Sequence, residues 1–322
     1  MAIVETGARL HFGFQNLSLA HERLYGGVGV ALEHPRAVIE VTRAPELDCP
    51  DPAVEPYAAA AVDRLGVEGA RVRVAERIDR HVGLGSGTQY ALACLVGLAA
   101  AHGDRVEPRA HAPALGRGGR SGIGVATFER GGFVVDAGHR TERFTTDPPA
   151  QGDWEVPDPI VRKPLPENWR FLLVRPDVES GRSDTAEDAS MRSVVERADP
   201  GIADEIATLL TRRLLPAIAE GRLSAFGSAV ARLSRLNGAW YADEQGGVYR
   251  PPAGQLVERL DESPVVTGAG QSSWGPTVYG VTSESALDRA VTDGERALEA
   301  AGVGGTVEAA RPRNEGAVVD SS

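Results

Sequence analysis

The sequence predicts an α+β fold, because its strands and helices do not follow the regular strand–helix–strand order of a doubly wound sheet. Apolar residues at every second position predict strands, and apolar residues three or four positions apart predict helices. Glycine-rich segments separate these elements at three places. With 322 residues, the chain is long enough for two domains and a large core.

Short strands dominate the first 75 residues. Alternating patterns predict strands at residues 3–6, 9–14, 29–32, 38–42 and 72–75. Between the last two of these, a helix is expected over about 52–65, because Val54, Ala58, Ala61 and Leu65 share one face and Gly66 provides a stop.

Residues 81–89 (HVGLGSGTQ) run directly into the strongest helix signal of the chain. Apolar residues over 90–101 recur at helical spacing and continue round the other faces, which predicts a central, buried helix with Ser86 as N-cap and Gly103 as its stop. The glycines let the backbone approach a ligand, and the helix N-terminus offers free N–H groups. This arrangement is typical of a phosphate site, although a glycine-rich turn before a core helix also occurs without a ligand.

A second glycine-rich segment spans residues 116–124, and two strands are expected after it, at 125–129 and 133–135. Between 145 and 166 the composition shifts toward proline, aspartate and glycine, which indicates a domain junction.

We therefore divide the chain into residues 1–155, with the phosphate-binding loop, and residues 156–322. In the second part, strands are expected at 171–175, 265–267, 278–282 and 306–309, and helices near 202–220, 223–241 and 284–301. A third glycine-rich turn lies at 267–276, and residues 316–322 are expected to be a loose tail.

Composition excludes several classes of function. A net charge of -11 argues against general nucleic-acid binding, although arginines beside the glycine-rich segments, namely Arg80, Arg117 and Arg120, can still bind an anion. No apolar run is long enough to span a membrane and the first residues lack a signal-peptide pattern, so a cytoplasmic protein is expected. Cys49 and Cys94 have no CxxC or Cys/His neighbours, which argues against a disulfide framework or a zinc site.

Three glycine-rich segments in one chain suggest a common cleft, and their order resembles the GHMP small-molecule kinase superfamily. The matching segments are Arg9-Leu10-His11, residues 83–88 before the buried helix, and residues 268–270. The resemblance spans nearly the whole chain. It implies an N-terminal ribosomal-protein-like α/β domain followed by a C-terminal ferredoxin-like domain.

Two positions depart from the kinase pattern. Gly87 stands where these kinases have a second serine, which supports the nucleotide-bound magnesium. Gly124 stands where mevalonate-kinase-like members have an aspartate, which usually takes the proton of the acceptor hydroxyl. Phosphoryl transfer needs a group that handles the attacking oxygen, so a different reaction is expected.

Within the superfamily, residues 9–13, 25–29, 83–89 and 116–136 resemble the beta-ribofuranosylaminobenzene 5'-phosphate synthase family. This resemblance implies condensation of phosphoribosyl pyrophosphate with 4-hydroxybenzoate or 4-aminobenzoate, with release of pyrophosphate and CO2, in the biosynthesis of a methanopterin-type cofactor. The expected cofactor is Mg²⁺, bound with the pyrophosphate. The alternatives are an ATP-dependent GHMP kinase and an idle superfamily member that binds a phosphorylated metabolite. A homodimer is expected, because most enzymes of this size form symmetric assemblies.

Four residues are expected to act in catalysis: Arg9, His11, Arg117 and Asp136. Arg117 or Arg120 would hold a phosphate or the benzoate carboxylate. His11 either orients the para substituent or the ribose, or is a hydrogen-bonded residue at a strand end. Asp136 either contacts magnesium or ribose, or forms a turn.

The ligand-binding residues are expected in the glycine-rich segments, and they are Gly83, Gly85, Ser86, Gly87, Thr88, Gln89, Ser121, Gly122, Gly268 and Gly270. Ser121 is expected to contact phosphate or to cap a turn. No set of metal ligands is indicated.

Overall fold

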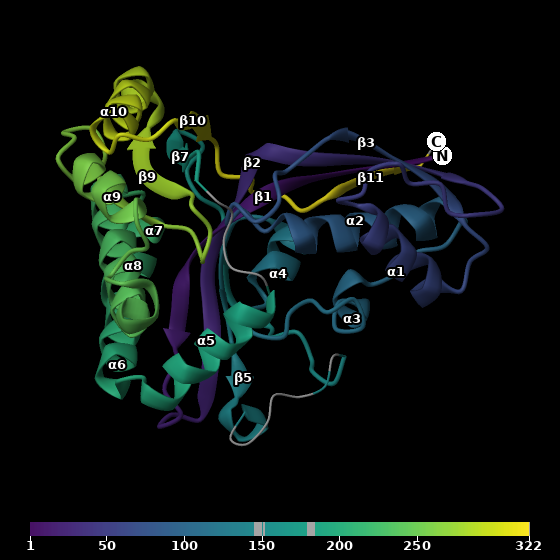
Figure 1. Ribbon diagram of the computed structural model, residues 1–322, viewed down its shortest axis with the longest axis horizontal. Helices are drawn as coiled ribbons and strands as arrows, with labels where there is room; N and C mark the ends of the chain where they lie inside the picture. Colours follow the sequence, from purple (N-terminus) through teal and green to yellow (C-terminus); the bar gives the residue numbers. More distant parts are fainter. Residues whose placement is uncertain (145–149, 151, 179–183, 322) are drawn as a thin grey trace.

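The computed structural model describes residues 1–144, 150, 152–178 and 184–321. In this part of the chain, the first half forms most of a seven-stranded antiparallel sheet with the central order β11-β1-β2-β4-β6, while β3 and β5 also pair with β2 (Figure 1). Its strands are β1 (Ala2–Asn16), β2 (Arg23–Arg43), β3 (Ala70–Glu76), β4 (Phe133–Asp136), β5 (His139–Arg140), β6 (Pro159–Lys163) and β11 (Val318–Ser321).

The strands expected in the first 43 residues are confirmed, but they join into two long ones. Residues 3–6 and 9–14 both belong to β1, and residues 29–32 and 38–42 both belong to β2. The pairing of β1 with β2 shifts register between Gly7 and Arg9 and again between His11 and Gly13. These irregularities interrupt the alternation of apolar residues, so the sequence pattern divides each strand.

Helices cover one face of this sheet. They are α1 (Glu55–Leu65), α2 (Ser86–Ala101), α3 (Pro108–His111) and α4 (Ile123–Arg130), and a 3₁₀ turn (Thr141–Phe144) follows β5. As expected, α2 is almost wholly buried and packs on β1 and β2. Its N-cap is not Ser86 but Gly85, whose φ of 77° is left-handed, and no side chain caps the helix.

The strand expected at 125–129 is wrong, because these residues belong to α4. Short apolar runs do not distinguish a buried strand from a buried helix. Here Val125, Ala126 and Phe128 are all buried, and Thr127 Oγ1 donates a hydrogen bond to the Ile123 carbonyl one turn earlier.

The second half forms a four-stranded antiparallel sheet with the order β10-β7-β9-β8. Its strands are β7 (Trp169–Pro176), β8 (Gly268–Gln271), β9 (Val278–Ser283) and β10 (Gly305–Ala310). Helices lie between β7 and β8 and between β9 and β10, which gives the ferredoxin-like arrangement. The strand expected at 265–267 begins instead at Gly268, so part of the third glycine-rich segment is strand.

The helices of this half are α5 (Asp184–Arg197), α6 (Pro200–Leu209), a π-helical turn (Leu210–Leu214), α7 (Leu215–Ala219), α8 (Leu223–Gln245), α9 (Ala253–Asp261) and α10 (Leu287–Ala300), with a 3₁₀ turn (Glu284–Ala286) before α10. The expected helices near 202–220, 223–241 and 284–301 are confirmed. Among the helices that the structure describes, none is long and apolar enough to cross a membrane.

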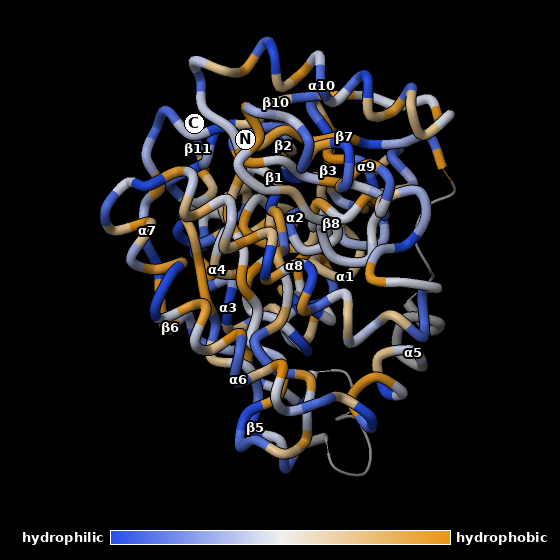
Figure 2. Tube along the Cα trace, turned by 90° about the vertical axis from the view of Figure 1, so that its left-hand side faces the viewer, coloured by the Kyte–Doolittle hydropathy of each residue, from blue (hydrophilic) through white to orange (hydrophobic). Residues whose placement is uncertain are grey.

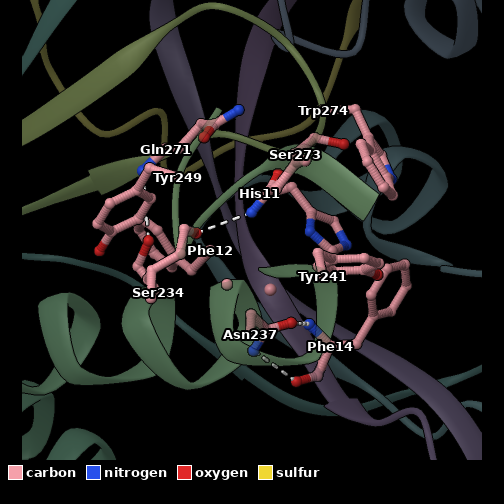
Figure 3. Close-up of a pocket in the computed structure, with 14 residues that line it drawn as sticks. His11, Phe12, Phe14, Ser234, Asn237, Tyr241, Tyr249, Gln271, Ser273 and Trp274 are labelled. Carbon is pink, nitrogen blue, oxygen red and sulfur yellow. Dashed lines mark hydrogen bonds between the residues drawn. The ribbon is translucent and has the colours of Figure 1, made fainter. Parts of the chain in front are cut away.

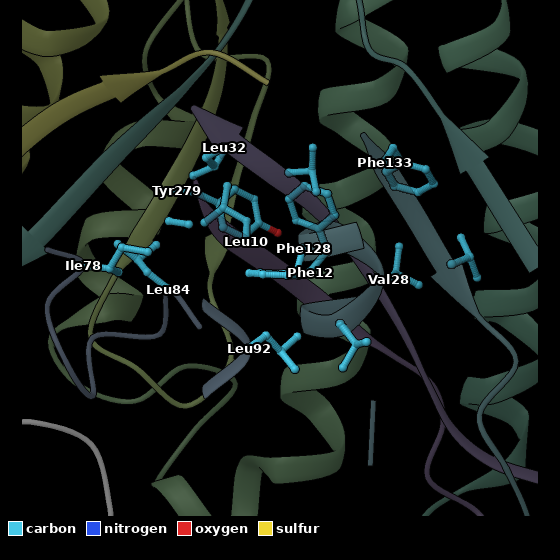
Figure 4. Packing of buried hydrophobic residues seen from close by; sticks show 14 of the residues in the cluster. Leu10, Phe12, Val28, Leu32, Ile78, Leu84, Leu92, Phe128, Phe133 and Tyr279 are labelled. Carbon is cyan, nitrogen blue, oxygen red and sulfur yellow. The ribbon is translucent and has the colours of Figure 1, made fainter. Parts of the chain in front are cut away.

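The two sheets share one hydrophobic core. One face of the second sheet packs against α9 and α10, while Phe171 and Tyr279 on its other face join the core of the first sheet. Phe12 of β1 lies at this junction, with ring centroids 6.2 Å from Phe171 and 5.1 Å from Tyr279 (Figure 4). The apolar segments of the chain accordingly run through the interior (Figure 2).

The first sheet contains strands from both sides of the expected division at residue 155. β6 pairs with β4, and β11 pairs with β1. The loose tail expected at 316–322 is therefore wrong for residues 318–321, which form β11. Residues 145–149 and 151 of the expected junction lie outside the described residues.

Candidate active site

The first and third glycine-rich segments are in direct contact, as the common cleft requires. A Cβ atom on Gly83, whose φ is 89°, would lie 2.4 Å from the Ser272 carbonyl oxygen. Ser272 Oγ donates a 2.8 Å hydrogen bond to the Gly83 carbonyl, and Thr277 Oγ1 donates a 2.6 Å bond to the Val82 carbonyl. The loop before α2 is thus fixed by the turn that follows β8.

Arg9 lies against the inner side of this loop. Its Nη1 donates a 2.9 Å hydrogen bond to the Gly83 carbonyl, and its backbone N–H donates to the Leu84 carbonyl at 3.0 Å. A Cβ atom on Gly85 would lie 2.8 Å from Arg9 Cγ. Arg9 therefore fixes the shape of the loop from β1.

Two arginines meet beside the N-terminus of α2. The guanidinium carbons of Arg117 and Arg80 lie 5.4 and 5.8 Å from the centroid of the Tyr57 ring. A Cβ atom on Gly87 would lie 3.0 Å from Tyr57 Oη and 3.2 Å from Arg117 Nη1. None of the carboxylates that the structure describes pairs with either guanidinium. Two unpaired cations and a helix N-terminus form a site for an anion.

Tyr57 has no signal in the sequence that marks it as part of a site, because it occupies an ordinary position in an amphipathic helix. Arg117 was identifiable from its glycine neighbours. The structure holds it through its backbone carbonyl, which accepts from Trp154 Nε1 at 2.9 Å, and through its own Nε, which donates to the Leu115 carbonyl.

Gln89 is buried and links three elements, and its expected role in ligand binding stays a prediction. Its Oε1 accepts a 2.5 Å hydrogen bond from Thr6 Oγ1 in β1, and its Nε2 donates to the Gly124 carbonyl in α4 at 3.0 Å. Thr88 packs against the same helix, because a Cβ atom on Gly124 would lie 3.1 Å from Thr88 Cγ2. The glycine at position 124 thus permits close packing of α2 and α4.

Asp136 is wholly buried, and its carboxylate accepts hydrogen bonds from the second glycine-rich segment. Oδ2 accepts from Gly122 N at 2.7 Å and Ser121 Oγ at 3.1 Å, and Oδ1 accepts from Gly138 N at 2.9 Å. Burial raises the pKa of Asp136 to about 6, against the opposing effect of these bonds. These hydrogen bonds make Asp136, Ser121 and Gly122 a structural frame, and the roles expected for them in catalysis and ligand binding stay predictions.

Gly268 and Gly270 also have close structural neighbours. They lie in β8, where a Cβ atom would come within 2.0 Å of the Gly227 carbonyl oxygen and 2.5 Å of Ser234 Oγ, respectively. Both contacts are with α8. These glycines permit close packing of a strand on a helix, which is a structural reason for glycine at both positions, and the ligand approach expected for them stays a prediction.

A pocket opens between β1, α8 and the turn after β8 (Figure 3). His11 in its wall is 4% exposed, and its Nε2 has no hydrogen-bond partner among the described residues. Burial, and secondarily the charge of Arg9, lowers the pKa of His11 to about 3, so the imidazole is neutral at physiological pH. The other aromatic residues in the wall are Phe12, Phe14, Tyr241, Tyr249 and Trp274.

The backbone around His11 is shaped by a close contact with α8. A Cβ atom on Gly13 would lie 2.4 Å from Asn237 Cγ, and Asn237 exchanges two hydrogen bonds with the backbone of Phe14. The register shift between His11 and Gly13 is a bulge of the kind that redirects side chains beside functional sites. Ser272 Oγ joins the pocket to the glycine loop, because it accepts from His11 N while donating to Gly83.

The described residues do not fit a dedicated metal centre, since they contain no cluster of three His, Cys, Asp or Glu side chains that could hold an ion. Asp136, the carboxylate expected to contact magnesium, is occupied by the loop. Mg²⁺ therefore stays a prediction.

Comparison with known proteins places this geometry in a family. The N-terminal domain of GHMP kinases matches residues 54–132, and the C-terminal domain matches residues 214–300. The structure resembles homoserine kinase from Cytophaga hutchinsonii with a TM-score of 0.65 and 16% identity, over 99% of this chain and 97% of that chain. The two-domain GHMP fold is thereby confirmed.

The sequence is 32% identical to beta-ribofuranosylphenol 5'-phosphate synthase from Methanothermobacter thermautotrophicus over 317 residues, which cover 88% of this chain and 89% of that protein. The chain belongs to the beta-ribofuranosylphenol 5'-phosphate synthase family. The protein of this name from Archaeoglobus fulgidus is 31% identical, over 91% of this chain and 92% of its own length. The chain is thus an enzyme of the synthase family on a kinase fold, as the motifs indicated.

Proposed function

We propose that this enzyme joins the ribose 5'-phosphate of phosphoribosyl pyrophosphate to a para-substituted benzoate, with release of pyrophosphate and CO2. The relatives from Methanothermobacter thermautotrophicus and Archaeoglobus fulgidus are named for a ribofuranosylphenol product, which favours 4-hydroxybenzoate over 4-aminobenzoate. The reaction would serve the biosynthesis of a methanopterin-type cofactor. A cytoplasmic location and a homodimer remain predictions.

The observation that carries this proposal concerns Gly87 and Gly124, the two positions at which this chain departs from the kinase pattern. Other side chains lie close to both of them. Tyr57 and Arg117 occupy the surroundings of Gly87, and Thr88 packs against Gly124. The loop keeps an anion site, but a serine at 87 and an aspartate at 124 would both meet side chains already in place. An anion site without an aspartate at position 124 supports a reaction in which pyrophosphate leaves and no carboxylate removes a proton from an acceptor hydroxyl.

The chemistry needs no such base. The bond between ribose C1 and pyrophosphate breaks, and its electron pair leaves with the pyrophosphate. The ring carbon that bears the carboxylate forms the new bond to C1, and loss of CO2 returns an electron pair to the ring. The carboxylate is already deprotonated, so no proton has to be removed.

The N-terminus of α2 and Arg117 would bind the departing pyrophosphate, with Arg80 nearby. A kinase reaction would require a carboxylate that accepts the hydroxyl proton, and the candidate Asp136 is enclosed by Ser121 and Gly122. This enclosure favours the synthase over the kinase.

Product analysis tests the proposal. Wild-type enzyme with phosphoribosyl pyrophosphate and carboxyl-labelled 4-hydroxybenzoate should release pyrophosphate and labelled CO2 in equal amounts. With ATP and mevalonate, homoserine or galactose, no ADP should form. Alcohol-dependent ADP formation, or the absence of pyrophosphate with either benzoate, would contradict it. Activity lost in EDTA and regained with Mg²⁺ would support the cofactor.

A further inference from the structure

We propose that the pocket of His11 binds the aromatic ring of the acceptor substrate, with the para hydroxyl against His11 Nε2. This inference deepens the proposed function and rests on it. It assigns the second substrate to a place separate from the anion site at Gly87 and Arg117.

The walls of the pocket suit a flat aromatic ring. Figure 3 shows the imidazole of His11 beside the rings of Phe14, Tyr241 and Trp274. The centroids of His11 and Phe14 are 4.9 Å apart and those of Tyr241 and Trp274 are 4.6 Å apart, both in edge-to-face geometry. A bound benzoate ring would extend these contacts, because aromatic rings prefer offset or edge-to-face neighbours.

The polar atoms of the pocket favour a hydroxyl as the para substituent of the acceptor ring. Asn237 is already satisfied by the backbone of Phe14, and Gln271 is bonded to the backbone at Gly275 and Arg250. Two buried polar atoms of the lining, His11 Nε2 and Tyr249 Oη, have no hydrogen-bond partner among the described residues, and His11 is the one that lies beside Phe14, Tyr241 and Trp274. Unpaired buried polar atoms are rare in proteins, and a ligand hydroxyl at His11 Nε2 would provide the missing hydrogen bond.

The same contact would assist the reaction. As the ring carbon bonds to ribose C1, positive charge spreads to the para oxygen, and its O–H becomes a stronger donor. A neutral imidazole that accepts this hydrogen bond stabilises the developing charge without removing the proton. His11 is held neutral by its buried position. Ser272, which contacts both His11 and Gly83, places the ring pocket next to the loop.

Calorimetric titration of the full chain, without phosphoribosyl pyrophosphate, tests the assignment. Wild-type protein should bind 4-hydroxybenzoate about tenfold more tightly than benzoate or 4-methoxybenzoate, as expected for one hydrogen bond to a buried group. His11→Phe keeps an aromatic wall, so it should still bind benzoate but should lose this preference. His34→Phe, the same change at an exposed position of β2, should leave it intact.

Equal affinity of the wild-type protein for the three ligands would overturn the inference, and this result does not depend on whether any variant folds. A preference that survives in folded His11→Phe would also overturn it. The proposed function is judged separately, by pyrophosphate and CO2 release. If wild-type enzyme releases both products but shows no hydroxyl preference, the function stands and the ring pocket lies elsewhere. If the preference is present but no product forms with either benzoate, the proposed function fails.

Discussion

Arg117 combines a charge that no described carboxylate neutralises with a position at the edge of the glycine loop. Its guanidinium stacks on Tyr57 and touches the space beside Gly87, so its side chain is already oriented toward the helix N-terminus. An anion at this place would gain a charge-assisted contact at little cost in side-chain entropy.

We therefore expect Arg117→Ala to impair catalysis and not folding. The loss of a charge-assisted contact costs about 1.5 to 3 kcal/mol, which lowers kcat/KM for phosphoribosyl pyrophosphate by roughly one to two orders of magnitude. Arg117→Lys should recover part of the activity, because an ammonium keeps the charge but not the planar fork. Steady-state kinetics and thermal unfolding measure both effects.

The matched control is Arg43→Ala, at the exposed end of β2, which should change neither kinetics nor melting temperature. Full activity in Arg117→Ala would show that the anion binds elsewhere. Loss of the cooperative melting transition would show that Arg117 is structural.

Sequence patterns identify only some of the residues that form the candidate site. Arg117 stands between glycines and His11 lies in a motif, so both were identifiable. Tyr57 and Trp274 were missed, because an aromatic residue in a helix or turn is usually core. The sequence pattern at Asp136 does not reveal that backbone N–H groups of Gly122 and Gly138 donate hydrogen bonds to its oxygens.

At the level of elements, the segment 116–124 depends on the buried Asp136, and this dependence predicts a pH effect. Burial raises the pKa of Asp136 to about 6, above its ordinary value of 3.8. Between these values the folded protein binds more protons than the unfolded chain, so this group's contribution to stability falls as pH rises from about 4 to 6.

Asp136→Asn removes this titration. The free energy of unfolding of the wild-type protein, relative to the variant, should therefore decrease by about 2 to 3 kcal/mol between pH 4 and pH 7. Urea unfolding at a series of pH values measures the difference, and comparison with the variant cancels the opposite effect of His11. A difference that does not change with pH would mean that the hydrogen bonds offset burial, and a difference that rises with pH would mean that they outweigh it.

Helices and strands could be predicted from the sequence where one pattern of apolar residues runs through the whole element. α2 is apolar on all faces and β7 is short and continuous, so both were found. The sequence pattern predicts a strand in place of part of α4, because a short buried apolar run fits a strand as well as a helix of eight residues. β11 was missed because its side chains are exposed, and its pairing with β1 is a tertiary effect.

At the scale of the molecule, the two sheets depend on each other through Phe12 and its neighbours, and the first sheet depends on the last strand. Deletion of residues 318–322 removes the hydrogen bonds between β11 and β1. We expect a loss of about 1 to 3 kcal/mol in the free energy of unfolding, because each such bond contributes roughly 0.5 to 1.5 kcal/mol. Kinetic constants should not change, since β11 is remote from the site.

Urea unfolding of the truncated and full chains provides the test, with deletion of Ser322 alone as the control. An unchanged midpoint would show that β11 contributes nothing to the sheet.

The pairing of β11 with β1 also has a consequence for synthesis on the ribosome. β1 ends at residue 16 and β11 begins at residue 318, so 301 residues are translated between two strands that are neighbours in the sheet. At about 5 to 20 residues per second, one edge of β1 stays uncovered for roughly 15 to 60 s. An open strand edge readily pairs with other chains. Nascent molecules on crowded polysomes are therefore most exposed to aggregation through β1, and a chaperone that covers this edge during translation would raise the yield of folded enzyme.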